Sequence, residues 1–595
     1  MKAFSYLLLG TALTVSACKV QPDSSVNTEN AIIAQNEAMV VAANPHAVDA
    51  GIEVLRAGGS AVDAAIAVQV VLGLVEPQSS GLGGGAFMLV YDNKSGDVWA
   101  YNGRETAPEN ITQKLFYGED GEPYRYFEGI KSGRSTGVPG AVAMLDQAHN
   151  DYGKLDWGDV HFKAGIELAT KGFAISPRLA DLLARMSRYG LSQHGATRDY
   201  FYQDDGKTPW PEGHILKNSN YANTLKALSA EPLALLKPPI STNIISTVQE
   251  EPRPGTLSQG DMDSYKTLKT PALCSPYRHY KICGPQPPAS GGVAVQSILG
   301  QLQHFDMKAL GPTIDGWHVF IEASFQAYAD RNKYVADPDF VPVNTDALLN
   351  PEYLKSRAGA ISLETAQKEI TAGTPYPYPL GKDATPDNPG TSHFTVMDKD
   401  GLVVSMTTTV EGPFGSGRMV DGFFLNNQLT DFSFRTHDED GLAIANAPAP
   451  KKRPRSSMGP TIVFDENGDF LFSTGSPGGN SIIAYIAKSI VGVLDWGLSP
   501  QDAVELPNVI ARRGRVRLEA KGLIDEETNE PVRAGPAAEF GMSPDIVAGL
   551  EALGHTVVKS KGEISGLHII YRNKDGSLSG AADPRREGIV NKIRD

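Results

Sequence analysis

Apolar side chains recur at helical spacing through most of the first 390 residues of the chain. Helices are predicted wherever apolar residues return every three or four positions. The predicted helical ranges are 45–55, 60–74, 156–182, 221–230, 293–305 and 317–330. Asn44 precedes a proline that begins the first helix, and Gly58-Gly59 ends it. Ser60, with Asp63 three residues later, predicts a capping box at the start of the second.

Alternating apolar and polar residues predict strands, most of them after residue 390. The predicted strand ranges are 87–92, 98–101, 392–397, 402–409, 423–425, 461–464 and 470–473. Asn467-Gly468 is a hairpin turn. Helices are predicted again over 481–494 and after Ser499-Pro500, which is a good cap followed by a first-turn proline. Such blocks favour an α+β fold of stacked layers, with sheets inside and helices outside.

Between these two regions, residues 337–389 show little periodicity and are rich in Pro, Gly, Thr and Asp. This composition predicts an exposed connector. A cut at its end, near residue 390, would cost little packing.

The length and charge of the chain narrow its class. With 595 residues it exceeds the usual single-core limit, so two lobes or one large layered domain are expected. Its net charge of −15 and the absence of a long basic run argue against nucleic acid and an anionic membrane surface as partners. We interpret the basic cluster at 451–455 as a local patch in a loop.

The N-terminus has the features of an export signal. Lys2 is followed by the apolar run 7–15 and by Ser16-Ala17 before Cys18. This pattern resembles a bacterial lipoprotein signal, which would remove residues 1–17 and lipidate Cys18. The alternative is an ordinary secretory signal that contains a cysteine. Residues 18–36 then suit a flexible tether, and no other run is long enough to span a bilayer. We therefore expect a periplasmic protein whose membrane attachment is the lipid anchor.

Two further cysteines lie nine residues apart, in a stretch that reads as strand, turn around Ser275-Pro276, and strand. Cys274 and Cys283 can form a disulfide in an oxidising compartment if they are hairpin neighbours. The alternative is a pair of buried thiols. Without well-spaced histidines they make no zinc site, and no metal is expected.

Two glycine-rich stretches superficially match known motifs. Residues 79–86 precede a predicted strand rather than a helix, so they lack the context of a nucleotide-binding loop, and their glycines favour close backbone packing. Residues 133–137 fit the G-x-S-x-G pattern of serine hydrolases, but neither the strand before it nor the helix after it is predicted. Ser135 is kept as a rival nucleophile.

Thr391 opens a predicted strand directly after a Pro-Gly turn. If the chain were cut before it, a free amine would stand beside a hydroxyl nucleophile, which is a known way to activate threonine. The predicted strand 402–409 would pair with it, and Thr409 could then meet that hydroxyl or amine. The alternative for both residues is β-branched sheet filler.

Four further places carry polar side chains suited to a binding site. Arg104 at a strand end can grip a carboxylate or pair with Glu105. Asp431 and Gln428 can hold an ammonium group, although loop capping explains some of their cluster. Residues 455–457 offer two hydroxyls beside a cation, and residues 474–479 end a strand before a helix, where backbone amides can face an oxyanion or simply form a turn.

Taken together, these stretches resemble the γ-glutamyltransferases, the glutathione-hydrolysing family of amino-terminal nucleophile hydrolases. The resemblance is carried by three motifs, Gly390-Thr-Ser-His-Phe394, Arg453-Pro-Arg-Ser-Ser-Met458 and Gly475-Ser-Pro-Gly-Gly479. It implies a four-layer αββα sandwich and self-cleavage between Gly390 and Thr391. The products would be a large subunit, 37–390, and a small catalytic subunit, 391–595, which stay together as a heterodimer.

The resemblance also implies roles for individual residues. Thr391 would be the nucleophile, positioned by Thr409, and the amides of Gly478 and Gly479 would stabilise the oxyanion. The donor's α-carboxylate would be held by Arg104, Ser456 and Ser457, and its α-amino group by Glu411, Gln428 and Asp431. Many relatives have Asn where this chain has Glu411. The stretch 434–450, where some members carry a lid, is shorter here.

The resemblance implies a γ-glutamyl hydrolase and transferase that acts on glutathione with water, an amino acid or a peptide as acceptor, and needs no cofactor. The alternatives are a glutaryl or cephalosporin acylase of the same fold, a non-catalytic binding lipoprotein, and the Ser135 hydrolase.

Overall fold

Seven antiparallel strands form the sheet that carries Thr391 in the computed structural model, which describes residue 1 and residues 37–385, 390–524 and 535–594. In spatial order they are β20 (Ile589–Arg594), β1 (Glu37–Ala42), β9 (Gly390–Met397), β10 (Val403–Glu411), β2 (Gly85–Asp92), β3 (Asp97–Gly103) and β6 (Leu268–Pro271). The expected signal peptide, Cys18 and the tether lie outside the described residues, apart from Met1. Strands from both expected subunits therefore pair within one sheet.

A second sheet of six strands faces the first. Its order is β19 (Leu578–Ala582), β18 (His568–Arg572), β14 (Phe470–Gly475), β13 (Thr461–Phe464), β8 (Tyr280–Gly284) and β7 (Leu273–Tyr277). An apolar cluster that includes Met39, Leu89, Met397, Phe464 and Ile570 fills the space between the two sheets. Burial of such side chains is the main favourable term that holds the sheets together.

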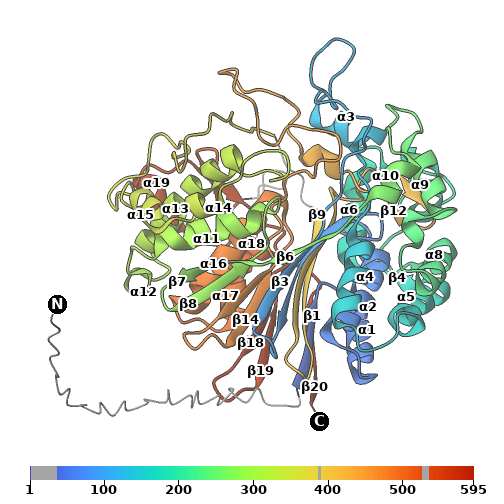
Figure 1. Cartoon of the computed structure of the whole chain (residues 1–595), viewed down its shortest axis with the longest axis horizontal. Coiled ribbons are helices and arrows are strands. Elements are labelled where there is room, and N and C mark those ends of the chain that lie inside the picture. Colours follow the sequence, from blue (N-terminus) through green and yellow to red (C-terminus); the bar gives the residue numbers. More distant parts are fainter. Residues whose placement is uncertain (2–36, 386–389, 525–534, 595) are drawn as a thin grey trace. The chain divides into compact units, whose positions relative to one another are not determined.

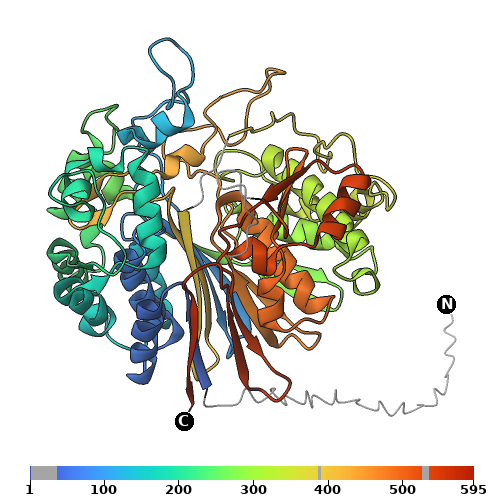
Figure 2. The same ribbon diagram turned by 180° about the vertical axis from the view of Figure 1, so that it is seen from behind.

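Helices cover the outer face of each sheet. On the first sheet lie α1 (Pro45–Arg56), α2 (Ala61–Val75) and α4 (Ala141–Tyr152), with α5 (Asp159–Lys171) and α8 (Ser219–Ala230) packed outside α2. On the second lie α11 (Ser290–Leu302), α16 (Ile482–Leu494) and α17 (Pro500–Glu505), with α13 (Ile314–Tyr334) against α11. The blue, teal and green helices lie on one side of the strands, and the yellow-green and orange-to-red helices lie on the other (Figures 1 and 2). The expected αββα sandwich is confirmed.

The remaining elements lie around this frame. The other helices are α3 (Tyr126–Ile130), α6 (Pro177–Ser187), α7 (Gly195–Phe201), α9 (Ile240–Val248), α10 (Gln259–Ser264), α12 (Met307–Leu310), α14 (Thr345–Leu348), α15 (Pro351–Ala358), α18 (Pro536–Phe540) and α19 (Pro544–Ala552). Small sheets are formed by β4 (Phe173–Ala174) with β5 (Ile215–Leu216), by β11 (Met419–Val420) with β12 (Phe423–Phe424), and by β15 (Val509–Arg512), β16 (Arg515–Glu519) and β17 (Val557–Ser560). Among the described helices, none has both the length and the apolar character that a membrane span requires.

Local sequence signals set the bounds of the first helices as predicted. The Asn44 side chain accepts the His46 amide at 3.0 Å at the start of α1. Ser60 and Asp63 form the predicted capping box of α2. Every residue of α2 is buried, which explains why it is rich in Ala and Val and has little polar surface.

One helix prediction and one connector prediction needed correction. The range 156–182 is not one continuous pattern, because Gly172, with φ of 100°, ends α5 before β4 and α6 follow. The expected connector 337–389 contains α14 and α15. The side chains of Asn344 and Asn350 cap these two helices, a local signal that the scarcity of apolar periodicity had obscured.

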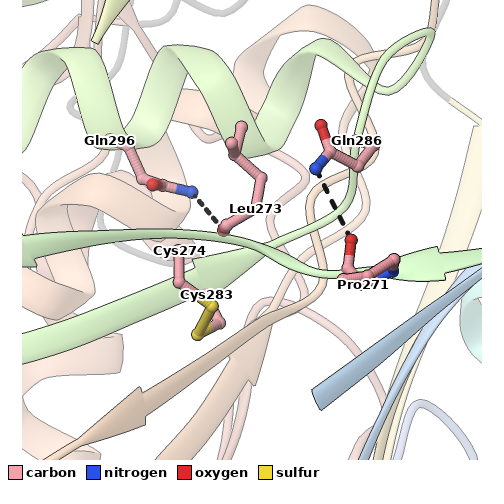
Figure 3. The surroundings of a disulfide bond; sticks show 6 residues. All are labelled: Pro271, Leu273, Cys274, Cys283, Gln286 and Gln296. Atoms are coloured by element: carbon pink, nitrogen blue, oxygen red, sulfur yellow. Dashed lines mark hydrogen bonds between the residues drawn. A yellow bond between two sulfur atoms is a disulfide. The ribbon is translucent and has the colours of Figure 1, made fainter. Parts of the chain in front are cut away.

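The expected disulfide between Cys274 and Cys283 is present (Figure 3). The two residues are cross-strand partners in β7 and β8, with their Cα atoms 4.1 Å apart. The turn lies at Arg278-His279, where Arg278 has φ of 56°, rather than around Ser275-Pro276. The Gln296 side chain of α11 donates to the Leu273 carbonyl at 2.9 Å and ties this hairpin to the helix (Figure 3).

Candidate active site

Thr391 and Thr409 face each other across neighbouring strands. They are direct partners in the register of β9 and β10, and both are almost completely buried. The Thr391 hydroxyl donates to the Thr409 hydroxyl at 3.4 Å, and the Thr409 hydroxyl donates to the Gly390 carbonyl at 2.5 Å. One threonine therefore touches both the hydroxyl and the carbonyl of the Gly390–Thr391 junction.

The backbone around Thr409 is irregular, and this irregularity directs the next side chain. The pairing shifts between Thr409 and Glu411, and Glu411 has φ of 81°. Such a conformation is uncommon for a residue with a side chain and occurs often at functional sites. Gly84 packs so closely that an added Cβ would lie 2.0 Å from the Thr409 carbonyl oxygen. The glycine-rich loop thus allows close backbone packing, as predicted, and holds β10 in place.

A small cavity opens at this point. Eight of the ten residues expected to carry the chemistry line it, namely Thr391, Thr409, Glu411, Gln428, Asp431, Ser456, Ser457 and Gly479. They come from β9, β10, the 3-10 turn Gln428–Asp431, the loop before β13 and the loop after β14. Arg104 and Gly478 are the two that do not line it.

One wall of the cavity is acidic, and its carboxylates are held in place. The Glu411 carboxylate accepts from the Tyr126 hydroxyl at 3.1 Å and from the Asn427 amide. The Asp431 carboxylate accepts from the Gln428 amide at 2.8 Å. Carboxylates fixed in this way can receive a ligand ammonium group without first being ordered.

Arg104 lies behind this wall rather than in it. Its guanidinium is fully buried and donates to Asp431 at 2.5 Å, to the Pro454 carbonyl at 3.0 Å and to the Arg455 carbonyl at 2.9 Å. Glu105 is 3.8 Å from Arg104, and its burial raises the pKa of its carboxyl to about 8. In this structure Arg104 therefore orders Asp431 and the loop that carries Ser456.

The opposite wall presents hydroxyls and a cation. The Ser457 hydroxyl accepts from Arg331 at 2.6 Å and donates to the Asn480 side chain at 2.6 Å. Arg331 also donates to the Ser290 hydroxyl at 2.9 Å, which in turn donates to the Ser456 carbonyl at 2.6 Å. Hydroxyls beside a guanidinium are suited to binding a carboxylate.

Arg455, the residue before Ser456, is buried and pairs with Asp383 at 2.6 Å. Burial opposes the charged form of Asp383, but the adjacent Arg455 guanidinium and further hydrogen bonds lower the pKa of this carboxyl below its usual value. The ion pair anchors the chain just before the Gly390–Thr391 junction to the loop of the serines.

Gly478 and Gly479 form the sharp turn after β14. Their φ angles are 135° and 57°, and a Cβ on Gly478 would lie 2.5 Å from the Tyr485 ring. Both the conformation and the space therefore require glycine at position 478. Within the described part of the chain, neither of these two amides donates a hydrogen bond. Unpartnered amides beside a nucleophile are suited to stabilising an oxyanion.

Four residues around the cavity were not predicted from sequence. Arg331 directly follows a predicted helix, and a basic residue at that place is usually explained by its favourable interaction with the helix dipole. Asn480 and Tyr126 carry no motif signal. Arg586 donates to the Thr391 carbonyl at 2.8 Å, and burial, with Arg178 nearby, lowers its pKa to about 9. These positions depend on contacts between distant segments, which a local pattern does not reveal.

Ser135 is not part of this arrangement. It is fully buried in a 3-10 turn, and its hydroxyl donates to the carbonyls of Ile130 at 2.9 Å and Ser132 at 2.8 Å. A serine nucleophile needs a base and an exposed turn between strand and helix. The structure provides neither at Ser135.

Two groups of three potential metal ligands lie outside the cavity, among the described residues. Asp63 gathers His149 at 3.3 Å and His161 at 2.9 Å. His318 and His555 are joined at 2.7 Å between ring nitrogens, beside Glu322. In the first group the ligand atoms bond to protein partners, which explains it as a buried polar network. In the second, His318 bonds to His555 and to the Ser362 carbonyl, while the Glu322 Oε1 atom lies 3.8 Å from His555 and has no hydrogen-bond partner among the described residues.

Comparisons with known proteins agree with this geometry. Residues 47–593 match the family model described as gamma-glutamyltranspeptidase. The glutathione hydrolase proenzyme of Escherichia coli (strain K12) is 33% identical, over 98% of this chain and 97% of that protein. The corresponding proenzyme of Bacillus subtilis (strain 168) is 32% identical, over 98% and 96%. The crystal structure of cephalosporin acylase from Bacillus halodurans superposes with a TM-score of 0.77 at 25% identity, over 93% of this chain and 96% of that one. The chain belongs to the gamma-glutamyltranspeptidase family.

Proposed function

We propose that the protein is a γ-glutamyl hydrolase and transferase that acts on glutathione and related γ-glutamyl compounds, after cutting its own chain before Thr391. The observation that carries the proposal is the position of Thr391. Its hydroxyl lies 3.4 Å from that of Thr409, in a cavity with acidic groups on one wall and hydroxyls with a guanidinium on the other. The near full-length relatives, which are glutathione hydrolase proenzymes, support both the substrate and the maturation.

Maturation begins with attack of the Thr391 hydroxyl on the Gly390 carbonyl carbon. The peptide bond breaks, its nitrogen takes up a proton, and an ester joins Gly390 to the Thr391 oxygen. Water then cleaves the ester and leaves Gly390 with a carboxylate and Thr391 with a free amine. The Thr409 hydroxyl, which donates to the Gly390 carbonyl, stabilises the negative charge that develops on that oxygen. The products are the large subunit, ending at Gly390, and the small subunit 391–595.

Turnover uses the same hydroxyl. The free amine of Thr391 accepts its proton while the oxygen attacks the γ-carbonyl of the donor. The amides of Gly478 and Gly479 stabilise the oxyanion, and the leaving amine departs with a proton. Water or an incoming amine then attacks the γ-glutamyl ester, so the products are glutamate or a new γ-glutamyl compound.

The two walls hold the two charged groups on the α-carbon of the glutamyl donor. Glu411, Gln428 and Asp431 bind its ammonium group, and Ser456 and Ser457 bind its α-carboxylate, with Arg331 supplying the nearby positive charge. Arg104 contributes by ordering Asp431. Oppositely charged walls fix the donor in one orientation, and orientation is a large part of catalysis.

A second candidate function is hydrolysis of glutaryl side chains, as in an acylase. The observation that favours it is the close superposition with cephalosporin acylase. A glutaryl donor has no α-amino group to meet Glu411 and Asp431, so the acidic wall argues for the γ-glutamyl donor. A non-catalytic binding protein would use the same cavity without cutting the chain.

We also propose export and attachment to the membrane through a lipid on Cys18. The short apolar run and the small residues before this cysteine support both steps. A Cys18→Ser variant is expected to lose radiolabelled fatty acid and to appear in the soluble periplasmic fraction. Unchanged labelling would refute the anchor.

The deciding experiment combines mass and activity. Intact mass under denaturing conditions, with N-terminal sequencing, is expected to show two chains, the smaller beginning at Thr391. The cut enzyme is then given γ-glutamyl-4-nitroanilide and glutaryl-4-nitroanilide, which differ only in the α-amino group. Preference for the first supports the proposal, and preference for the second supports the acylase. A single uncut chain, stable at neutral pH, would refute the nucleophile mechanism.

A further inference from the structure

A second hollow lies directly beside the candidate active site. The two spaces share Gly479 and Asn480, which lie on the wall between them. The new hollow also contacts Gly478, so the turn with the unpartnered amides borders it on one side. If the carbonyl of a donor binds at this turn, the second hollow lies next to the amine that leaves it and next to the amine that replaces it.

Four arginines line this hollow, and they come from one hairpin. Arg512 ends β15 and Arg515 begins β16, and the two are cross-strand partners. Arg513 lies in the turn between them, and Arg517 follows two positions later on β16, on the same face as Arg515 because side chains alternate along a strand. In a chain with a net charge of −15, residues 509–518 contain no acidic side chain. The hollow is therefore a local region of positive potential.

The arginines differ in how far their charge is already satisfied. Arg517 forms a two-pronged pair with Glu563, at 2.8 and 3.0 Å, and donates to Ser481 at 3.0 Å. Arg513 donates to the carbonyls of Ala384 and Thr385 at 2.8 and 2.7 Å. By contrast, Arg515 makes no hydrogen bond or ion pair within the described parts of the chain, and its side chain is exposed. Arg515 is the arginine ready to receive an anion.

We propose that this arginine hollow is the subsite for the carboxylate of the leaving amine, and of the accepting amine that replaces it. The inference rests on the proposed function, because it places the γ-glutamyl carbonyl beside Gly478 and Gly479. The subsite selects γ-glutamyl peptides with a free C-terminal carboxylate. An extended dipeptide reaches about 7 Å beyond the broken bond. Glutathione carries a carboxylate at that distance.

The hollow takes a carboxylate better than a phosphate or a nucleic acid. The Arg515 guanidinium, which has no partner among the described residues, matches one carboxylate as a fork of two parallel donors. Because the site is partly open to solvent, its contribution is expected to be modest and to weaken with salt.

The test compares two chromogenic donors that differ by one carboxylate, γ-glutamyl-4-nitroanilide and γ-glutamyl-3-carboxy-4-nitroanilide. Glutathione and its glycine ethyl ester form a second pair with the natural leaving group. Arg515→Gln is compared with Arg188→Gln, a control on an exposed arginine after α6 whose side chain also has no partner within the described residues. Cleavage of each variant is first verified by intact mass.

We expect Arg515→Gln to raise the KM of the carboxylated member of each pair by about three- to ten-fold. The kcat and both parameters of the neutral member should stay within a factor of two. Arg515→Lys should keep only part of the preference, because it retains the charge but not the fork of two donors. Arg188→Gln should change none of these values. An equal effect on both members of a pair, or no effect, would overturn the subsite. Wild-type protein that turns over no γ-glutamyl donor would instead overturn the proposed function.

Discussion

Replacing Thr409 by valine removes one hydroxyl and leaves the shape of the side chain almost unchanged. That hydroxyl donates to the Gly390 carbonyl at 2.5 Å and accepts from the Thr391 hydroxyl at 3.4 Å and the Glu411 amide at 2.8 Å. The variant therefore loses the donor at the oxygen where negative charge develops during self-cleavage, and it also releases the nucleophile from its partner.

The expected size of the effect follows from these contacts. Loss of one donor to a developing oxyanion slows a reaction by about 10²–10³-fold, or about 3–4 kcal/mol of barrier. The Glu411 amide also loses its acceptor in a buried site, which costs about 1–3 kcal/mol of folding stability. A slower cut in a folded, somewhat less stable chain is therefore expected, rather than a failure to fold.

The assay follows pulse-labelled precursor from cell-free translation on a denaturing gel. Thr408→Val is the matched control, because Thr408 is buried in the same strand and its hydroxyl has no hydrogen-bond partner among the described residues. We expect the precursor half-life to lengthen at least 100-fold in Thr409→Val and to stay within a few-fold in Thr408→Val. Cutting of Thr409→Val at the wild-type rate, or equal slowing of both variants, would refute the reasoning.

Four further predictions concern the site and its frame. Gly478→Ala should lower kcat at least 100-fold in steady-state kinetics. The reason is that the φ of 135° and the Tyr485 ring, 2.5 Å from the added Cβ, force the turn to move. A normal kcat would exclude an oxyanion role. Tyr126→Phe removes the 3.1 Å bond to Glu411 and should raise the KM of γ-glutamyl donors about five-fold, with no change for glutaryl donors; an equal change for both would point to general disorder. Burial raises the pKa of Glu322 to about 7, above the 4.5 of an ordinary glutamate, so the folded state holds this proton more tightly and the free energy of unfolding falls as pH rises from about 4.5 to about 7. Denaturant titrations should show that Glu322→Gln removes up to roughly 3 kcal/mol of this decline. A variant with the same pH profile as the wild type would contradict the assignment. Cys274→Ser with Cys283→Ser opens a loop of nine residues' separation and should cost about 2–3 kcal/mol of stability, seen as a lower Tm, while reductant should lower the Tm of the wild type but not of the double variant.

Several parts of the fold follow from short-range sequence signals. The Ser60–Asp63 capping box and the Asn44 cap set the starts of α2 and α1, and the Asn467-Gly468 turn joins β13 to β14. Each of these depends on residues within four positions of one another. The connector 337–389 also carries short-range signals, because Asn344 and Asn350 cap α14 and α15. Its low apolar periodicity predicts no helix there, which is why the prediction was wrong.

The candidate site divides in the same way. Thr391 at a strand start, with Thr409 eighteen residues later on the partner strand, can be inferred from sequence because a hairpin fixes their register. From the sequence, Arg104 could be recognised only as a cation at the end of a predicted strand. Its place behind Asp431 depends on segments more than 300 positions apart.

By itself the sequence indicated the family, the alternation of layers and a possible disulfide, and it predicts a cut between Gly390 and Thr391, because these rest on motifs and on periodicities of two and 3.6 residues. Only the tertiary structure decided that Arg331 reaches Ser457, that Arg586 holds the Thr391 carbonyl, and that a hairpin of arginines borders the oxyanion turn. The physical reason is that the shape and electrostatic potential of a cavity are sums over groups brought together by folding. No window along the chain contains that sum.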